Sequence, residues 1–463
     1  MIYLISATLT AVSGYVIGHH ARLLRKNLAY DIALGWFIGS GYFSLAYLAV
    51  QHVTGVAPMA SISVGIVALP LLSAGYRWRE FSGFVAETLS RHKLRQEKIS
   101  FSAFEAILVA VVVAVVLLAV FHGISTPTNG DDALRSRGYH PLLVHAGVVD
   151  INNSIFHNGI WPNYAPLLSW HLNGSADHFY LNYGVLTLAV FFMVLVYTSP
   201  AQKRNTRQGL YSLFLVVSIP LFVFHMTSTY IDIFLIVAVA LGYLFFSLYI
   251  RDGDETDLNT SIIFFTLVSF AKTKGIITGL TGFGFIGMYL VREFWENRRL
   301  PSIRVAGFGV PFLLFLAIKE YHDPMLSGLF RMAAGAPADI IRQSNEVMPD
   351  NTVGEKSAAF WHSLFISGNF GIHFYLLIGA TVAYFRRIFS TKLVWDFLFL
   401  SAIFFETYYF MVYWYVNMPY HQSILHRVVM MLSVICALFL ATCFARGEDE
   451  GEIGETGGRQ GPV

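Results

Sequence analysis

The chain has 463 residues, of which 55% are hydrophobic, 16% aromatic and only 13% charged. Soluble globular domains carry a charge on about a quarter of their residues, so this composition excludes an ordinary soluble protein. The formal net charge of +2 arises from basic residues shared among short connections, which gives no indication of a nucleic-acid partner.

Apolar segments of about 17 to 25 residues recur along the whole chain, and each is long enough to cross a bilayer core as a helix. We therefore predict an all-α polytopic membrane protein with about 13 transmembrane helices and two larger extracytoplasmic loops. The predicted spans are 2–18, 29–52, 57–76, 102–123, 179–198, 209–226, 229–250, 259–271, 275–293, 303–319, 361–385, 393–416 and 427–445.

Lys and Arg collect in alternate connections between these spans, and cationic connections stay on the cytoplasmic side of a membrane. The predicted cytoplasmic group comprises Arg22, Arg25, Lys26, Arg77, Arg79, Arg91, Lys93, Arg95, Lys98, Lys203, Arg204, Arg207, Arg292, Arg298, Arg299, Arg304, Arg386, Arg387 and Lys392. The N-terminus, loop 124–178 and loop 320–360 then lie on the extracytoplasmic side. Loop 320–360 contains a segment around 338–346 with the pattern of an amphipathic surface helix, although most of its charges equally fit a solvated loop.

The most polar part of the chain is the stretch 121–179, between two long apolar segments. Asp131 and Asp132 follow the preceding predicted helix by a few residues, which places two carboxylates close to the membrane surface. They are our leading candidates for chemistry. Aromatic and imidazole side chains come after them, a mixture that suits binding of a sugar or a lipid phosphate. This group includes Tyr139, His140 and Trp161.

Charged residues also stand at the ends of predicted spans, where the cost of burial near lipid makes them functional candidates. Asp232 begins an apolar segment on the extracytoplasmic side, where it can face loop 124–178 or simply stabilise the amides of its own helix. Lys272 and Lys274 flank a tight turn on the same side. Two ammonium groups there would hold a lipid phosphate, although lysines at span ends also commonly reach back to water.

His421 and Arg427 precede the last predicted span on the extracytoplasmic side. The planar guanidinium of Arg427 suits two phosphate oxygens. It also has structural partners in the preceding span, namely Asp396 or the better placed Glu406. Both interpretations of Arg427 fit the sequence equally well.

Carboxylates prefer hard cations, so Asp131, Asp132 and Asp232 are the residues that would hold Mg²⁺ or Mn²⁺ if the protein uses one. The histidines do not indicate a zinc site, because they form no HExxH pattern.

The chain resembles the polyprenyl-phosphate-dependent, multi-spanning glycosyltransferases of the C-type (GT-C) fold, the superfamily of protein O-mannosyltransferases and lipid A aminoarabinose transferases. The segments that carry the resemblance are NGDDALRSRGYHPLLVHAGVVDINNSIFHNGIWPNYAPLLSW, STYIDIFLIV and FAKTKG. The resemblance implies an acid at Asp131 or Asp132 in the catalytic position, a later acid at Asp232, and contacts to the donor phosphate from Lys272, Lys274, His421 and Arg427.

The resemblance covers residues 103–445, and it divides the chain into three parts. Residues 102–445 form the GT-C-like catalytic module. Residues 1–101 are an addition of transmembrane helices and a cytoplasmic loop, because the acidic loop of the family follows the first helix rather than the fourth. The acidic, glycine-rich tail 446–463 is expected to be a disordered cytoplasmic segment.

What the resemblance implies is a glycosyltransferase of a bacterial inner membrane, with its active site on the periplasmic side. It would move a sugar from a polyprenyl-phosphate donor to a lipid, polysaccharide or protein acceptor by an inverting single displacement, with membrane lipids as further partners. Two alternatives stay open. A polysaccharide ligase or polymerase of the cell envelope would depend on Arg and His rather than on an acidic pair. A lipid-linked sugar transporter or flippase would have interrupted helices and internal repeats.

Overall fold

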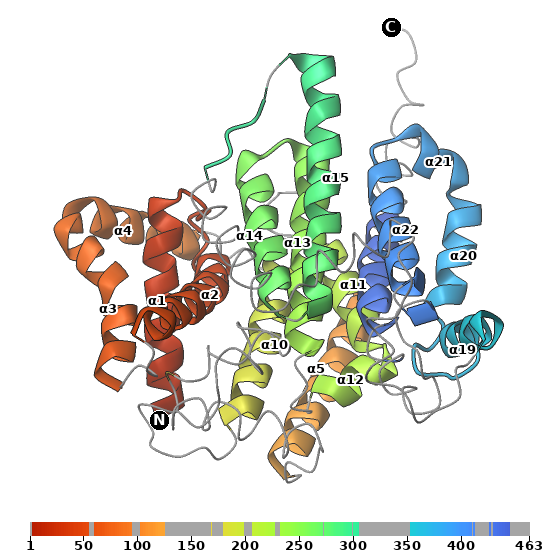
Figure 1. Cartoon of the computed structure of the whole chain (residues 1–463), viewed down its shortest axis with the longest axis horizontal. Helices are drawn as coiled ribbons and strands as arrows, with labels where there is room; N and C mark the ends of the chain where they lie inside the picture. Colours follow the sequence, from red (N-terminus) through yellow and green to blue (C-terminus); the bar gives the residue numbers. More distant parts are fainter. Residues whose placement is uncertain are drawn as a thin grey trace, which may run out of the picture.

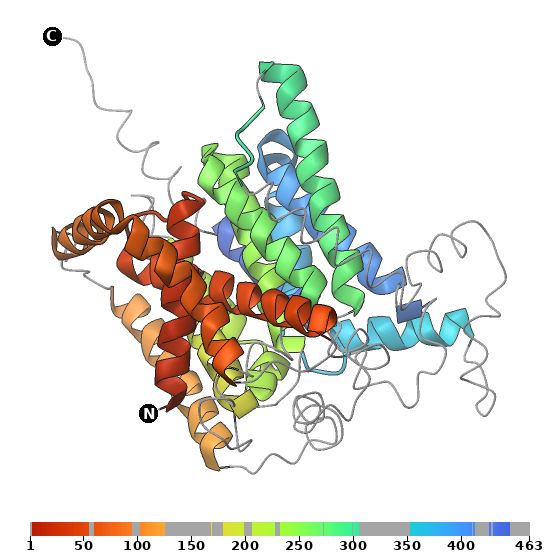
Figure 2. The ribbon, with the colours of Figure 1, turned by 60° about the vertical axis from the view of Figure 1, so that its left-hand side comes forward.

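The described part of the chain is built from α-helices. The computed structural model describes residues 2–54, 60–94, 102–125, 168, 179–198, 206–226, 232–271, 273–298, 300–304, 352–409, 411–412, 426 and 429–444. No strand occurs within these ranges, which confirms the all-α prediction for them. Most of the helices run side by side, whereas α2, α4 and α19 lie across the others (Figures 1 and 2).

The helices in chain order are α1 (Ile2–His20), α2 (Leu28–Thr54), α3 (Ala60–Tyr76), α4 (Trp78–Leu94), α5 (Ala103–Ser125), α10 (Phe179–Thr198), α11 (Thr206–Val217), α12 (Pro220–Met226), α13 (Asp232–Asp252), α14 (Glu255–Ala271), α15 (Thr273–Asn297), α19 (Val353–Phe365), α20 (His373–Ala383), α21 (Phe385–Ser390) and α22 (Leu393–Tyr409). A last apolar helix covers Val429–Phe444.

Three described helices are long and apolar enough to cross a membrane, and they cover Tyr30–Gln51, Asp232–Asp252 and Lys274–Asn297. A fourth crossing is added if α3 and α4, which are bent by 94° relative to each other, count as one span. Large apolar side chains on the outer surfaces fit a lipid environment, since Leu72 on α3 and Leu118 on α5 are 70% and 68% exposed. These features indicate a membrane protein, while the total of about 13 spans stays a prediction.

The centre of the bundle is α13, whose side chains are apolar on every face. An apolar helix of this kind has to be buried on all sides, and its most apolar window is entirely inside the protein. Phe245 of α13 stacks on Phe264 of α14 with 5.7 Å between ring centroids. Tyr243 stacks on Phe399 of α22 at 5.3 Å. In a membrane, lipid already solvates apolar side chains, so burying them inside the protein gains little from the hydrophobic effect. Tight packing contacts such as these therefore stabilise the bundle.

Glycines let α1 and α2 approach until their backbones touch. A Cβ atom at Gly39 would lie 2.0 Å from the carbonyl oxygen of Thr10, and one at Gly14 would lie 1.9 Å from that of Gly35. No larger residue fits at these contacts, as in other close crossings of membrane helices. The two helices therefore form one rigid unit.

Helix α4 was not predicted, because its sequence was assigned to a cytoplasmic connection. Phe81 of α4 packs edge-on against Tyr15 of α1, with ring centroids 5.9 Å apart, and Phe84 lies 4.6 Å from the ring of His19. The turns of α4 that provide these apolar contacts also carry its charged residues. That amphipathic pattern is typical of a helix lying along a membrane surface, and it is a signal that the sequence already contained.

Two predicted spans are wrong as continuous helices. Segment 361–385 is divided between α19 and α20, and the turn between them contains Gly368 and Gly371 at φ values of 71° and 58°. Glycine adopts this left-handed conformation without the strain that other residues incur. Segment 209–226 is divided between α11 and α12 at Pro220, which cannot donate the backbone hydrogen bond that a continuous helix needs.

One end of the bundle, which we call the charged end, joins connections that are distant in sequence. Arg25 forms ion pairs with Asp257 and, at 3.5 Å, with Asp254, so the connection after α1 is tied to the turn between α13 and α14 and to the first turn of α14. Arg304 lies 3.7 Å from Glu255 in the same turn. The Lys392 ammonium donates to the carbonyl of Arg251 at 3.4 Å.

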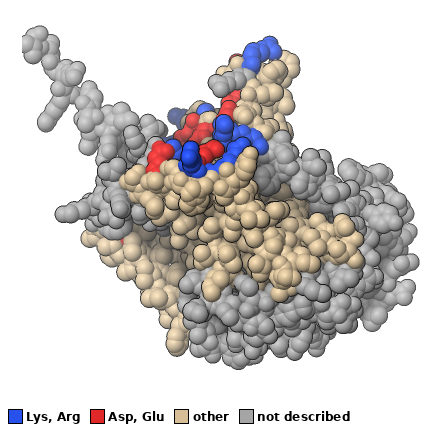
Figure 3. All heavy atoms as spheres, turned by 90° about the vertical axis from the view of Figure 1, so that its left-hand side faces the viewer, with Lys and Arg blue, Asp and Glu red and all other residues tan. Residues whose placement is uncertain are grey.

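These contacts agree with the prediction that the cationic connections share one side of a membrane. Figure 3 shows acidic and basic side chains gathered at this end, above a face made largely of other residues. The opposite end is formed by the first turns of α13 and α15 and the last turns of α14 and α22.

Candidate functional site

Most of the predicted site residues lie outside the described part of the chain. They are Asp131, Asp132, Tyr139, His140, Trp161, Lys272, His421 and Arg427. The amphipathic segment 338–346 and the tail 446–463 also lie outside it. The structure therefore describes two of the predicted residues, Asp232 and Lys274.

Asp232 is the first residue of α13, at the end of the bundle opposite the charged end. Its side chain is buried, with 3% of the residue exposed. The first turn of α13 meets the first turn of α15, because a Cβ at Gly275 would lie only 3.1 Å from Leu235 Cδ1. Asp232 and Lys274 thus belong to the same end, as the sequence predicted. The position of Asp232 in a first helical turn also fits the alternative of an acid that stabilises helix amides.

Lys274 is buried in the first turn of α15. Only 4% of the residue is exposed, so its ammonium group does not reach back to water. It interacts electrostatically with the carboxylate of Glu406 on α22. The alternative of a lysine that extends to the membrane surface is therefore wrong for Lys274. A buried lysine near a carboxylate is typical of a functional position in membrane helices.

Glu406 is the functional candidate whose surroundings sequence reasoning missed. Its Oε1 accepts a hydrogen bond from Thr278 Oγ1 at 2.5 Å, and its Oε2 accepts one from Thr281 Oγ1 at 2.8 Å. From the sequence, Glu406 was predicted only as a structural partner for Arg427. The structure shows that both carboxylate oxygens are already bound by α15.

A signal for this contact was present in α15. Lys274, Thr278 and Thr281 are spaced by four and three residues, so they lie on one face of the helix. That polar face meets Glu406, the one acid in the second half of α22. An isolated acid in an apolar helix needs a partner, and the polar face of α15 was the available one.

Glycines on a neighbouring face of α15 fix its distance from α14. A Cβ at Gly275 would lie 2.0 Å from the carbonyl oxygen of Val268, one at Gly279 would lie 2.1 Å from Ser269 Oγ, and one at Gly282 would lie 2.4 Å from the ring of Phe265. Close helix packing therefore accounts for these three glycines. The packing holds the polar face of α15 against α22.

A second polar group lies where the predicted spans are interrupted. His373, at the start of α20, has Nε2 2.8 Å from the carbonyl of Leu215 and Nδ1 2.7 Å from that of Phe370. The Asn369 amide nitrogen lies 3.1 Å from His426 Nδ1, and the carbonyl of Asn369 accepts from the backbone N–H of Leu221 at 3.0 Å. These contacts bind the broken helices to each other. His373 and Asn369 were not predicted as candidates, although Gly368 and Gly371 lie next to them in the sequence.

The described residues provide no group of three or more His, Cys, Asp or Glu side chains that could hold a metal ion. Of the three carboxylates predicted for Mg²⁺ or Mn²⁺, only Asp232 belongs to the described part of the chain. A single carboxylate does not make a cation site.

In comparisons of the chain with protein-family models, with curated proteins and with solved structures, nothing matched.

Proposed function

We propose that the chain is a GT-C-like membrane glycosyltransferase that moves a sugar from polyprenyl phosphate to an acceptor outside the cytoplasm. The observation that carries the proposal is a set of charged side chains at one end of the bundle: the buried Asp232 and Lys274, and Glu406, which accepts hydrogen bonds from two threonines. Charges inside an apolar bundle are costly, and burying them is typical of a site that handles a charged substrate. A phosphate attached to a lipid tail is a substrate of this kind.

In the proposed reaction the acceptor hydroxyl oxygen attacks the anomeric carbon of the donor sugar. The bond between that carbon and the phosphate oxygen breaks, and polyprenyl phosphate leaves with the electron pair. Asp131 or Asp132 takes the proton from the hydroxyl as general base. A single displacement inverts the configuration at the anomeric carbon.

Positive charge has to meet the departing phosphate, and Lys274 supplies it together with Lys272 and Arg427. An ammonium group has three N–H donors, so Lys274 can face Glu406 and a donor phosphate at the same time. Glu406, fixed by two threonine hydroxyls, positions Lys274 for this contact. Asp232 orients the acceptor, and His421, His140, Tyr139 and Trp161 complete binding of donor and sugar.

The wider arrangement belongs to the same proposal. About 13 spans would surround the site, and the prenyl tail would enter sideways from the bilayer. The membrane is a bacterial inner membrane, and the acceptor is a glycan, lipid or protein on the periplasmic side. The cationic connections at the charged end support this orientation.

A lipid-linked sugar flippase is the second candidate. The division of α11 from α12 and of α19 from α20 favours it, because transporters often build their sites from interrupted helices. A flippase would move its lipid without changing a covalent bond, which separates the two candidates experimentally.

The test is mass spectrometry of glycolipids and envelope polysaccharides from cells with and without the gene. Cells without it should lose one sugar modification and accumulate the polyprenyl-phosphate donor. Complementation with Asp131→Asn, Asp132→Asn and the double variant should fail to restore the sugar, while the variant proteins still reach the membrane. Full restoration by the double variant would remove loop 124–178 from the mechanism. Donor accumulation without a purified-protein transfer product would favour the flippase.

A further inference from the structure

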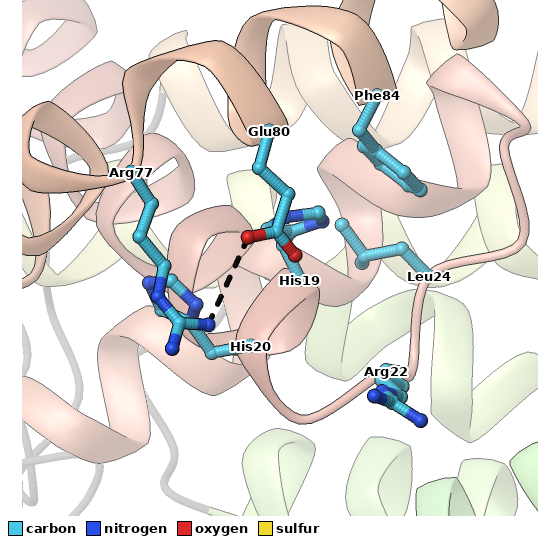
Figure 4. A pocket seen from close by; sticks show the side chains of 7 residues that line it. All are labelled: His19, His20, Arg22, Leu24, Arg77, Glu80 and Phe84. Atoms are coloured by element: carbon cyan, nitrogen blue, oxygen red, sulfur yellow. Dashed lines mark ion pairs between the residues drawn. The ribbon is translucent and has the colours of Figure 1, made fainter.

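A pocket of about 280 Å³ lies at the charged end, far along the chain from the proposed donor site. It opens between the C-terminal end of α1, the connection that follows it, and the start of α4 (Figure 4). Its polar lining consists of His19, His20, Arg22, Arg77 and Glu80, and Leu24 and Phe84 add an apolar wall. The proposed function uses none of these residues.

The local fold builds this pocket from several parts. The 94° bend between α3 and α4 brings Arg77 and Glu80 across the end of α1. His20 Nε2 lies 3.1 Å from Ser73 Oγ, which fixes the end of α1 against α3. Arg22 has a φ of 56°, a turn conformation that directs the chain away from the end of α1. The pocket walls are therefore held by contacts between separate helices.

The far wall is fixed by a contact between the α1–α2 connection and α4. Lys26 Nζ forms an ion pair with Glu87 at 2.5 Å, and its ammonium lies 5.9 Å from the ring centre of Phe84. Phe84 in turn packs on the ring of His19. This arrangement keeps the apolar side of α4 against α1 and leaves the polar lining open to the outside.

The charge of the lining favours an anion. Arg22 and Arg77 bring two guanidinium groups, whereas Glu80 brings one carboxylate, which lies 3.8 Å from Arg77. His19 and His20 add ring N–H donors, and Figure 4 shows the two imidazoles beside the Arg77–Glu80 pair. Guanidinium groups present paired N–H donors that match the oxygens of a phosphate.

The surroundings place the pocket at the level of lipid headgroups. Tyr76 and Trp78, at the bend between α3 and α4, are 92% and 63% exposed, and aromatic residues of this kind concentrate at membrane interfaces. Leu69 and Leu72 on α3 are exposed below them, as expected for contact with acyl chains. Basic residues next to such an interface attract anionic lipids.

We propose that this pocket binds a phosphate monoester at the cytoplasmic membrane surface, with Arg22 and Arg77 on the phosphate oxygens and the histidines as further donors. The phosphate can belong to a lipid headgroup or to a soluble molecule, and the exposed aromatic and apolar residues beside the pocket favour the lipid. Without ligand Arg77 pairs with Glu80, and when phosphate binds Arg77 pairs with the phosphate oxygens instead.

The experiment is native mass spectrometry of the full chain in detergent, titrated with phosphatidic acid and, separately, with diacylglycerol of the same acyl chains. Wild type should retain phosphatidic acid and not diacylglycerol. Arg22→Gln and Arg77→Gln should each weaken retention roughly fivefold, and the double variant about 25-fold. Glu80→Gln should strengthen retention, because it removes a negative charge from the lining.

Arg79→Gln is the matched control, since Arg79 is an exposed arginine of α4 outside the pocket. Thermal unfolding of each variant and Arg77→Lys, which keeps the charge, separate loss of binding from loss of folding. Inorganic phosphate added to the titration distinguishes the sources: efficient competition points to a soluble phosphate, and none points to a lipid. Equal retention by the double variant and Arg79→Gln, or equal retention of both lipids by wild type, would overturn the proposal.

Discussion

At the charged end Arg25 belongs to a connection, and its partners lie in the α13–α14 turn and the first turn of α14, whereas at the opposite end Lys274 and Glu406 both lie within helices. Arg25 pairs with Asp254 and Asp257 and so joins α1 and α2 to the turn between α13 and α14. Burial alone would lower the pKa of Arg25, but the neighbouring Tyr30 and Asp257 raise it above its ordinary value, so the guanidinium stays charged. The ion pairs of Arg25 with Asp254 and Asp257 have a structural role, because they hold separate parts of the chain together.

The charges at the opposite end tie together α15 and α22, two helices that already pack in an apolar bundle. Replacing a buried ion pair with apolar residues often leaves stability unchanged or improves it, so stability alone is a weak reason for one. The comparison teaches that charges at the two ends differ in purpose: those at the charged end hold separate parts of the chain together, and in our proposal those at the opposite end act on the substrate.

The largest effect is expected at Asp232. Asp232→Asn keeps the size of the side chain and removes its charge, so the acceptor loses the group that orients it and transfer of sugar should fall by about a hundredfold. The free energy of unfolding should fall by no more than about 1 kcal/mol, which is the usual value of an acid in a first helical turn. Transfer assays on membranes and thermal unfolding of the purified variant check both numbers. Normal transfer together with lower stability would reduce Asp232 to a helix-stabilising acid.

At the charged end the expected pattern is reversed. Arg25→Gln leaves the fully buried side chain of Asp257 without its main cation, which should cost about 3 to 5 kcal/mol of stability. The activity of the protein that remains folded should be unchanged. Lys26→Gln is the matched control, because Lys26 and Glu87 are 32% and 41% exposed and their ion pair should contribute less than about 1 kcal/mol. Equal losses for the two variants would contradict a structural task specific to Arg25.

Lys274→Gln tests the contact to the donor phosphate. Loss of a hydrogen bond to a charged group costs about 1.5 to 3 kcal/mol, so kcat/KM for the donor should fall by about 10-fold to 100-fold, mainly through kcat, because negative charge on the phosphate grows as it departs. Steady-state kinetics at varied donor concentration measures kcat and KM separately. An unchanged kcat/KM with a lower melting temperature would show that Lys274 only interacts with Glu406.

The smallest effect is expected from Gly275→Ala, which acts on the site through packing. The new Cβ would lie 2.0 Å from the carbonyl oxygen of Val268, so α15 has to move away from α14 and carry Lys274 with it. We expect a loss of about 1 to 3 kcal/mol in stability together with lower activity. In Gly284→Ala, on the same helix, the added Cβ meets nothing within 4 Å, and stability should rise by about 0.5 to 1 kcal/mol. The same result for both glycines would rule out the tight contact.

The sequence predicted the features that depend on local composition. Apolar stretches located most helices. The positions of Lys and Arg predicted that several connections share one side of the membrane, and Arg25 and Arg304, which belong to two of these connections, form ion pairs at the same end of the bundle. The breaks at Pro220 and Gly368 were missed, because long apolar runs were weighed above the residues that interrupt them. The amphipathic pattern of α4 was missed because charges were read as a sign of a loop.

Within the site, Asp232 and Lys274 were found because charges at span ends are visible in the sequence. The environment of Glu406 was not, because it depends on which face of α15 turns toward α22. Neither helix alone determines that contact. The glycines that set the rotation of α15 act through Val268 and Phe265 of a third helix.

The central claim is that Asp232, Lys274 and Glu406, at the end of the bundle opposite the charged end, act on a phosphate-linked sugar. The most direct measurement is transfer of labelled sugar from polyprenyl-phosphate donors, extracted from the native membrane, by purified wild type, Asp232→Asn and Lys26→Gln proteins. The account predicts a new labelled acceptor with wild type and Lys26→Gln, and none with Asp232→Asn. Equal labelling by all three proteins, or no covalent product with any of them, would contradict it.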